Sequence, residues 1–473
     1  MNKEKSKRIP KKALIIEALT FLMTYGFFQF GYPYHLMRRE QLDLFLFDGD
    51  YISQTYVGKA WLARFISDFF EQFFILPVAG PAIVALLLTA IGIVTYRICR
   101  KYIAKWPSLL IAAAIFGWSF MRETGNLYST RYTIVVLGYL ALILGALQFK
   151  KHVFKIAALI PMLCFGWWSL GSPYHENYGK AWGTPKFDYE RLIGLDAEAA
   201  RENWDKVCKL SEKDLYMKEA SYFFNLAHAM KGDIGERLLE HSQGNPYDLL
   251  LRISSEQSVF TNSIAGEAWY HLGNMSMAEQ SAITTLQASP NHTGARFIKR
   301  LANISLARGN EIAANKYLGL LSKTLFYSRW ANGMMHGHRN EATESQILEA
   351  RKKLDDVDFV HLGDMPRAVL KGLLDADPEN TLAQNYLLCY DLMRYDLEQF
   401  AEDYNLNKID ARLYHEAILI WLSAKGNLTI ETAEEYGASA SDITRMNSFG
   451  RNPERYRNTY WFYYLQALNR TEQ

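Results

Sequence analysis

The first third of the chain is a series of long apolar stretches separated by short polar ones. Five stretches approach the length of a membrane-spanning helix, at residues 13–32, 74–96, 106–121, 132–148 and 156–173. The last four contain no Lys, Arg, Asp or Glu. Because roughly 20 apolar residues cross a hydrocarbon core about 30 Å thick, we predict a transmembrane domain over residues 1–173. The stretch 106–121 is the shortest, and whether it crosses completely is left open.

The basic residues around these stretches predict their orientation. Lys and Arg are concentrated in residues 1–12, 97–105 and 149–155, whereas the opposite loop 122–131 has only two. Positively charged loops stay in the cytoplasm, so we expect a cytoplasmic N-terminus and everything after the fifth span outside. No small-residue cleavage site follows the first stretch, which favours an uncleaved span over a signal peptide.

Residues 35–73 form the first outer loop in this topology, and they are too apolar for a free loop. Apolar side chains recur at helical spacing from Leu62 to Phe73, and the polar residues Asp68 and Glu71 fall on the opposite side. This pattern is typical of an amphipathic helix that lies in the membrane interface with its apolar face toward the lipid.

After residue 173 the composition becomes that of a soluble protein. Residues 174–188 are punctuated by Gly and Pro and are predicted to be a linker. Residues 189–473 show helical periodicity in segment after segment and almost no alternating strand pattern. We therefore predict an all-α protein, in which a multi-span transmembrane helical domain is followed by an extracytoplasmic helical domain.

Internal repeats are visible in the second half. The clearest helical pair places small residues, Gly266 and Ala278, on facing helices around a Gly273-Asn274 turn. A second pair turns at Gly309, and other candidate turns lie at residues 232, 395 and 426. Small residues let two helices approach closely, so this pattern resembles tetratricopeptide (TPR) repeats and predicts a TPR-like α-solenoid. An ordinary helical bundle is the alternative.

Composition and charge exclude several classes of protein. The 52 basic and 50 acidic residues leave a net charge of +2, which excludes a bulk nucleic-acid binder. The 4 cysteines have no paired spacing, so they form neither a disulfide framework nor a zinc ribbon. Phosphate-binding glycine loops and the G-x-S-x-G motif are absent from the sequence. We therefore expect no cofactor, no metal site and no nucleic-acid partner.

Three segments together carry a family resemblance: REQLDLFLFDGDY from residue 39, RENWDKVCKL from residue 201 and WYHLGNMSMAEQSA from residue 269. With them, the chain resembles a family of uncharacterised integral membrane proteins from Gram-negative anaerobes. These proteins have an N-terminal multi-span domain and a C-terminal TPR-like region. The resemblance implies a bacterial inner-membrane protein with a periplasmic C-terminal domain, and it transfers no catalytic residue.

The leading functional hypothesis is a scaffold. A helical-repeat domain presents an extended face, so we expect it to bind a protein or peptide partner while the first domain anchors it in the lipid bilayer. The residues expected to bind the partner are Trp269, His271 and Lys299 on the first helices of the repeats.

The alternative hypothesis is an envelope enzyme. The first outer loop is rich in carboxylates and is similar to that of lipid-linked glycosyltransferases, which use such residues as a base or a metal ligand. The candidate catalytic residues are Glu40, Asp43, Asp48 and Asp50. A cavity that converges on these carboxylates favours the enzyme, and an open groove in the repeats favours the scaffold.

Overall fold

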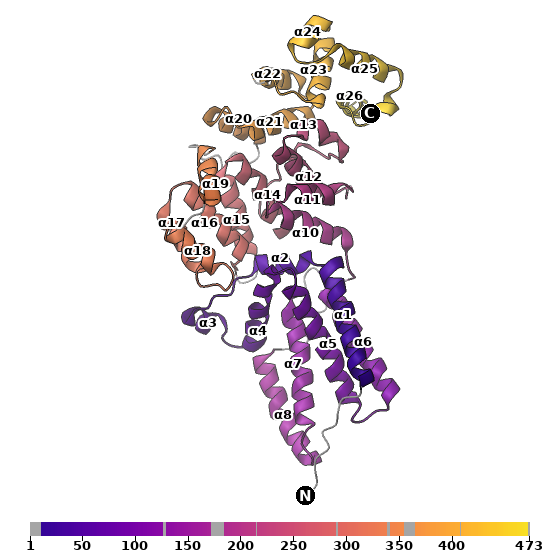
Figure 1. Cartoon of the computed structure of the whole chain (residues 1–473), viewed down its shortest axis with the longest axis vertical. Helices are drawn as coiled ribbons and strands as arrows, with labels where there is room; N and C mark the ends of the chain where they lie inside the picture. Colours follow the sequence, from indigo (N-terminus) through magenta and orange to yellow (C-terminus); the bar gives the residue numbers. More distant parts are fainter. Residues whose placement is uncertain are drawn as a thin grey trace. The chain divides into compact units, whose positions relative to one another are not determined.

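The protein was analysed as a computed structural model, which describes most of the chain. The described residues are 11–125, 129–171, 184–213, 215–289, 292–337, 341–353, 365–406 and 408–471. Within them, the regular elements are α-helices, short 3-10 helices and one π-helical turn, with no β-strand (Figure 1). The predicted all-α fold class is therefore confirmed.

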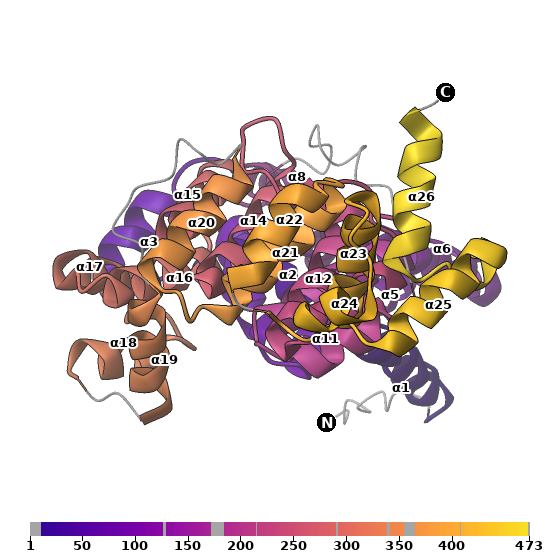
Figure 2. The same cartoon turned by 90° about the horizontal axis from the view of Figure 1, so that it is seen from above.

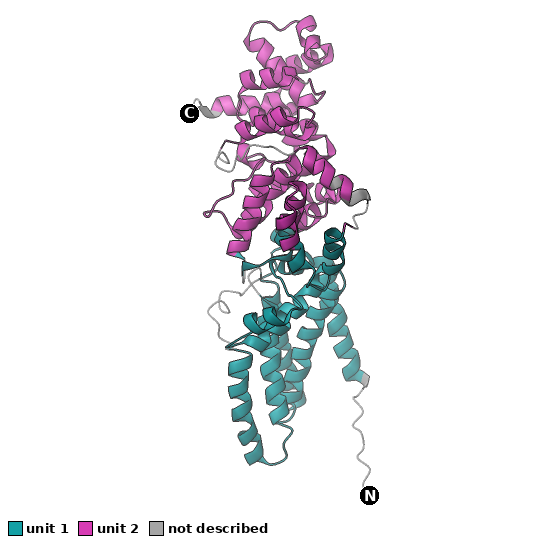
Figure 3. Cartoon of the chain, turned by 90° about the vertical axis from the view of Figure 1, so that its left-hand side faces the viewer, with its two compact units in different colours: residues 1–193, 289–298, 318–336 teal, residues 194–288, 299–317, 337–473 magenta. Residues whose placement is uncertain are grey.

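The chain forms two compact units, each built from several segments (Figure 3). Unit 1 comprises residues 1–193, 289–298 and 318–336, and unit 2 comprises residues 194–288, 299–317 and 337–473. The predicted transmembrane domain therefore falls in unit 1, together with two segments from the predicted repeat region. Most of the predicted linker 174–188 lies outside the described residues, and α10, Phe187–Ala199, begins within it.

Unit 1 is built around helices that coincide with the predicted apolar stretches. Its elements are α1 (Lys11–Gly26) with the π-helical turn Phe27–Gly31, α2 (Tyr34–Leu42), α3 (Gly49–Thr55), α4 (Trp61–Glu71), the 3-10 helix Gln72–Ile75, α5 (Ala79–Cys99), α6 (Lys105–Glu123), α7 (Thr130–Ala146), α8 (His152–Ser169) and α18 (Ser328–Met335). The second predicted stretch, 74–96, begins as a helix only at Ala79, because Phe74 still belongs to the 3-10 helix.

Three of these helices are long and apolar enough to cross a membrane by length and composition: Lys12–Gly31, Ala79–Cys99 and His152–Ser169. Thr130–Ala146 is a shorter apolar helix. Apolar side chains of these helices are exposed: Met23, Phe30 and Val153 are 75%, 83% and 73% exposed. The third predicted stretch, 106–121, is helical within α6, but α6 is not one of these three helices.

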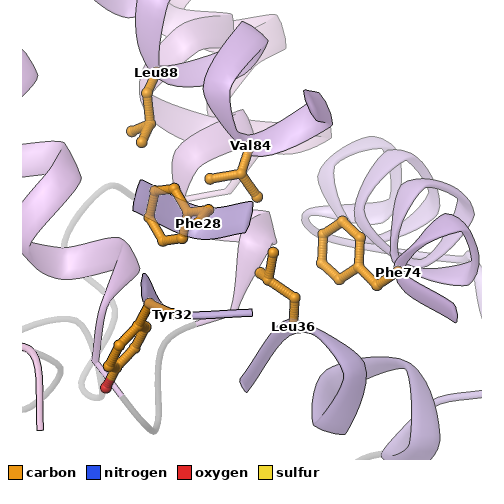
Figure 4. Close-up of a cluster of buried hydrophobic side chains, with 6 residues drawn as sticks. All are labelled: Phe28, Tyr32, Leu36, Phe74, Val84 and Leu88. Atoms are coloured by element: carbon orange, nitrogen blue, oxygen red, sulfur yellow. The ribbon is translucent and has the colours of Figure 1, made fainter. Parts of the chain in front are cut away.

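A buried apolar cluster holds the helices of unit 1 together. It joins the π-helical turn and α2 to the 3-10 helix and α5, through Phe28, Tyr32, Leu36, Phe74, Val84 and Leu88 (Figure 4). Each such side chain contributes about 1.5–3 kcal/mol on burial. The cluster packs the first turn of α2, through Leu36, against the 3-10 helix, through Phe74.

Unit 2 consists of helices that alternate with short turns. They are the rest of α10, then α11 (Trp204–Ser211), α12 (Lys218–Lys231), α13 (Ile234–Arg237), α14 (Val259–Leu272), α15 (Met275–Ala288), parts of α16 (Ala295–Ala307) and α17 (Glu311–Leu321), α19 (Glu341–Lys352), α20 (Pro366–Ala376), α21 (Thr381–Met393), α22 (Leu397–Leu406), α23 (Arg412–Ala424), α24 (Ile430–Glu435), α25 (Ala440–Arg451) and α26 (Tyr460–Thr471). Near the C-terminus, α23 contacts α24, α25 and α26 (Figure 2).

The predicted helical pair is present as α14 and α15. The Gly266 backbone N–H donates to Ser281 Oγ at 3.0 Å, and a Cβ added at Gly266 would lie 2.6 Å from the Ser281 Cβ. Ala278 and Ala282 are 1% and 2% exposed. All five predicted turn positions have positive φ: 80° at residue 232, 102° at 273, 69° at 309, 60° at 395 and 70° at 426. The turns therefore lie where predicted, and the stacking of the pairs as a TPR-like solenoid stays a prediction.

Candidate functional site

Three carboxylates of unit 1 lie close together at the C-terminal ends of α2 and α4. Oxygen atoms of Asp43, Asp68 and Glu71 all lie within 4.8 Å of one another. Asp43 caps the end of α2, and its backbone N–H donates to the Glu40 carbonyl oxygen at 3.2 Å. Asp68 and Glu71 are three residues apart on α4, so the helical repeat places them on one face. We call these three residues the carboxylate cluster.

The hydrogen bonds around the carboxylate cluster come from neutral groups. Tyr56 Oη donates to Asp68 Oδ2 at 3.0 Å. Glu71 Oε1 accepts from Ser67 Oγ and from the Thr130 backbone N–H, both at 3.2 Å. Within the described residues, no Lys or Arg lies within ion-pair distance of the three carboxylates. Among the residues that the structure describes, no contacting cation therefore neutralises their negative charges.

Burial and mutual repulsion shift the protonation of the cluster. Glu71 is 6% exposed, and Asp43 and Asp68 are partly buried. Burial, with repulsion from the other two carboxylates, raises the pKa of Asp43 well above its usual value. Burial and the Glu71 charge raise the pKa of Asp68 to about 7, although Arg131 acts in the opposite direction. Burial also raises the pKa of Glu71. The cluster can therefore hold or release a proton near neutral pH.

A small cavity opens beside the cluster, entirely within unit 1. It is lined by Glu40, Asp43, Leu44, Phe45, Glu71, Gln72, Ala295, Thr324, Phe326 and Tyr327. It leaves about 20 Å³ for the centre of a water-sized particle, which is roughly the space that one water molecule needs. Tyr327 Oη donates to Glu40 Oε1 at 2.8 Å, so the segment that follows α17 contributes directly to the cavity wall.

Backbone contacts from distant segments hold the loop that carries Asp43. The Ala295 N–H donates to the Asp43 carbonyl oxygen at 3.0 Å, and the Phe47 N–H donates to the Lys323 carbonyl oxygen at 2.7 Å. The ring of Phe45 is 2% exposed and lies 5.5 Å from the ring of Phe65 on α4. These contacts fix both ends of the short segment between α2 and α3, so the Asp43 carboxylate has a defined position.

Of the four candidate catalytic residues, the structure brings two to the cavity. Glu40 and Asp43 line it. Asp48 instead caps α3 by accepting from the Tyr51 N–H at 2.9 Å, and it pairs with Lys323 Nζ at 2.7 Å. Asp50 lies in the first turn of α3 and is exposed. Glu40 and Asp43 therefore face the cavity, whereas Asp48 stabilises the start of α3.

Sequence reasoning missed Asp68, Glu71 and Gln72 as site residues. The sequence pattern predicts Asp68 and Glu71 on the polar side of an amphipathic helix, opposite its apolar face, and makes no prediction for Gln72. In the structure that face is directed inward: Ser67 is 1% and Glu71 is 6% exposed. The signal available in the sequence was the pair of carboxylates three residues apart on a helix, in the same predicted outer loop as Asp43.

The predicted partner-binding residues all lie in unit 2, but they do not form an exposed surface. Trp269 is 1% exposed and belongs to the core of α14. The His271 side chain is 10% exposed, and its Nε2 lies 3.6 Å from Glu267 Oε1. Lys299 on α16 is partly buried. The role of these residues in partner binding stays a prediction.

Comparison with known proteins gives one match. The sequence profile of a family of unknown function (DUF6057) matches residues 7–176 and 172–467. No curated protein and no solved structure matches the chain. The resemblance to an uncharacterised family is thereby confirmed at the level of family membership. Because the two matched ranges together cover nearly the whole sequence, the chain belongs to the DUF6057 family of unknown function.

Proposed function

We propose that this protein is an integral membrane enzyme of the bacterial envelope, and that the carboxylate cluster is its catalytic centre. The observation that carries the proposal is the cluster itself: three carboxylates within 4.8 Å of one another, without an ion pair, beside a cavity. Gathering like charges away from water is unfavourable for folding, and such arrangements are concentrated at functional sites.

The proposed chemistry is proton abstraction from a substrate hydroxyl during transfer of a group to or from a lipid-linked carrier. Its support is the raised pKa of Asp68, about 7, because a general base works best when its pKa is near the ambient pH. A cavity of this size admits a hydroxyl or a water molecule but not a whole sugar. The carrier class is supported by the similarity of the first outer loop to that of lipid-linked glycosyltransferases.

The proposal includes a five-span topology in the inner membrane. In it α1 with its π-helical turn, α5, α6, α7 and α8 cross the bilayer, with the N-terminus in the cytoplasm and unit 2 in the periplasm. At 1.5 Å per residue, α6 is about 28 Å long, close to the thickness of a hydrocarbon core. The carboxylate cluster then lies on the periplasmic side.

A labelling experiment tests this topology. Single cysteines are placed at Lys101, Lys151 and Asp50, with Cys99 and the other native cysteines replaced. An impermeant thiol reagent is then applied to cells with a permeabilised outer membrane. Only the cysteine at position 50 should be labelled. Labelling at Lys101 without labelling at Asp50 would invert the topology.

The enzymatic proposal is tested by analysing lipids in a strain that lacks the gene. Wild-type protein and two variants, Asp68→Asn and the matched control Asp50→Asn, are returned to this strain at equal protein levels. Mass spectrometry of lipid extracts should show a lipid-linked intermediate that accumulates without the gene. We expect wild type and Asp50→Asn to remove it and Asp68→Asn to leave it. A deletion strain with an unaltered set of lipid-linked intermediates would refute the proposal.

A scaffold function of unit 2 is the second candidate, and one observation favours it. A polar cleft of about 550 Å³ is lined by residues of both charges, among them Lys352, Lys353, Asp377 and Glu379. A cleft of this kind suits an extended peptide with charged side chains. We favour the enzyme over the scaffold because open polar clefts are common on soluble domains, whereas buried carboxylates without a contacting cation are rare.

A further inference from the structure

The carboxylate cluster has the geometry of a cation site. Oxygens that ligate Ca²⁺ lie about 2.3–2.6 Å from the ion, so two ligands on opposite sides are about 4.6–5.2 Å apart. The three carboxylates of the cluster offer oxygens that all lie within 4.8 Å of one another. One ion placed among these oxygens can therefore come close to the Ca²⁺–oxygen distance for all three carboxylates.

Gln72 supplies an independent indication of a missing ligand. Its side chain is 9% exposed, and it lines the same cavity as Asp43 and Glu71. Its Nε2 donates to the Phe69 carbonyl oxygen at 3.3 Å, whereas its Oε1 is buried and has no hydrogen-bond partner. A buried amide oxygen almost always has a partner, and side-chain amide oxygens are common ligands of Ca²⁺.

The surrounding charges leave the negative charge of the cluster uncompensated. Arg39, which acts on Glu71 from a distance, is in direct contact with Glu123. Arg64 donates to the Val57 carbonyl oxygen, and Arg131 stacks on the ring of Tyr132. The cavity also contains Glu40, which adds to the negative charge. The two ways of neutralising such a site are shared protons and a bound cation.

We propose that Asp43, Asp68, Glu71 and the amide oxygen of Gln72 bind one divalent cation, of the size of Ca²⁺, on the wall of the cavity. The space of about 20 Å³ accommodates a water molecule as a further ligand. This inference rests on the proposed function, because it assigns a cation to the same catalytic centre. With the cation bound, Asp68 would be a ligand and not the base, and the cation would instead make a substrate hydroxyl more acidic. It departs from the expectation, drawn from the sequence motifs, that the protein has no metal site.

The test is equilibrium dialysis of ⁴⁵Ca²⁺ against the full-length protein in detergent, after treatment with a chelator. Wild type should bind one Ca²⁺ per chain in a saturable manner. Glu71→Gln and Asp43→Asn should weaken binding at least tenfold, and Gln72→Met, which keeps the length and removes the oxygen, should weaken it severalfold. Asp50→Asn is the matched control, because its carboxylate is exposed and lies outside the cluster; it should bind like wild type.

Thermal unfolding of the same samples distinguishes a lost ligand from a misfolded variant. Ca²⁺ should raise the melting temperature of wild type and of Asp50→Asn, because a ligand that binds only the folded state stabilises it. Asp43→Asn should melt higher than wild type in chelator, since one repelling charge is gone, and should not respond to Ca²⁺. A folded Asp43→Asn protein that binds Ca²⁺ as tightly as wild type would overturn the proposal.

Competition with Mg²⁺ and Mn²⁺ identifies the size of ion that the site prefers. Ca²⁺ should be the strongest competitor against ⁴⁵Ca²⁺. If wild type binds none of the three ions at millimolar concentration, the cation proposal is wrong. In that case loss of lipid conversion in Asp68→Asn would still support a purely proton-based catalytic centre. Conversely, Ca²⁺ binding by wild type together with normal lipid conversion by Asp68→Asn would support an ion with a structural role. That result would refute the proposed enzymatic function.

Discussion

Buried acids occur in both units, but they are neutralised in different ways. In unit 2, Glu416 is 0% exposed and contacts Arg412 at 3.1 Å and Arg445 at 3.3 Å. It also accepts from the Tyr460 backbone N–H at 2.7 Å. In unit 1, the hydrogen bonds that the described residues donate to the carboxylate cluster come from neutral groups. Glu416 therefore joins helices through its cations, whereas the carboxylate cluster has no such partner among the described residues, which is the feature on which the proposed site rests.

The comparison also shows that a raised pKa does not identify a site by itself. Burial raises the pKa of Asp391 in unit 2 to about 7, the same value as for Asp68. Asp391 nevertheless accepts from Arg367 Nε at 3.0 Å, so its environment includes a cation in contact. The two acids differ in their surroundings. Asp391 has an arginine in contact, whereas Asp68 belongs to a cluster beside a cavity.

The largest loss of folding stability is expected from removing a partly buried arginine of unit 2. Arg367 contacts both Asp391 and Asp403, and both acids are almost fully buried. Arg367→Met leaves Asp403 with Lys371 and removes the cation that contacts Asp391. The change should lower the free energy of unfolding by about 3–5 kcal/mol. Hydrogen exchange of α20–α22 in the full chain measures it. Arg457→Met, which breaks an exposed pair with Glu454, should cost less than about 1 kcal/mol; equal effects would show that burial does not matter.

A smaller loss of stability is expected from overpacking the helical pair of unit 2. Ala282 on α15 is 2% exposed, so Ala282→Leu has no free space for its added carbons. The change should cost roughly 1–3 kcal/mol. Thermal unfolding of the full chain, followed by exchange in α14 and α15, measures it. Ile283→Leu on the same helix is 40% exposed and is the control; a similar loss there would contradict the packing account.

The pH dependence of stability tests the unpaired state of Asp68. Its pKa is raised from 3.8 to about 7 in the folded protein. The folded state therefore binds more protons than the unfolded state between these values, and stability must fall as pH rises from about 4 to about 7. We expect a loss on the order of 2 kcal/mol in chelator. Asp68→Asn should flatten this dependence in denaturant unfolding, and an unchanged slope would contradict the assigned environment.

The smallest effect on stability is expected at the predicted partner surface. Lys299→Glu changes a partly buried side chain of α16 and should leave the melting temperature nearly unchanged. If unit 2 is a scaffold, this variant and His271→Glu should capture less of a partner that copurifies with wild type. Unchanged capture by both folded variants would remove these residues from any partner surface of unit 2.

Much of the fold could be predicted because helices and turns are encoded locally. The apolar stretches are helices α1 and α5–α8, and the turn positions at residues 232, 273, 309, 395 and 426 all have the left-handed conformation. The boundaries differ where tertiary packing intervenes. Phe74 lies in a 3-10 helix because its ring is buried in the cluster with Leu36, and α5 begins only after it (Figure 4).

The candidate site was only half predictable. Glu40 and Asp43 stand out as carboxylates in an apolar loop, but the sequence does not show that Asp48 is used as a helix cap. Glu71 has the helical position of a solvent-facing residue, and its burial depends on α7, whose Thr130 N–H donates to it. Tyr327 reaches Glu40 from a segment far away in the sequence. Such contacts are set by tertiary structure and have no local signature.

The most direct test of the proposed catalytic centre compares two carboxylates of the segment between α2 and α3. Asp43→Asn and Asp48→Asn both remove one charge and keep the shape of the side chain, but only Asp43 belongs to the carboxylate cluster. Each is returned to the deletion strain at equal protein level, and the lipid-linked intermediate is quantified. We predict that Asp43→Asn lowers its conversion by about 10²–10⁴-fold, as for loss of a catalytic acid–base group, whereas Asp48→Asn converts it almost normally. Normal conversion by Asp43→Asn would contradict the proposed catalytic centre.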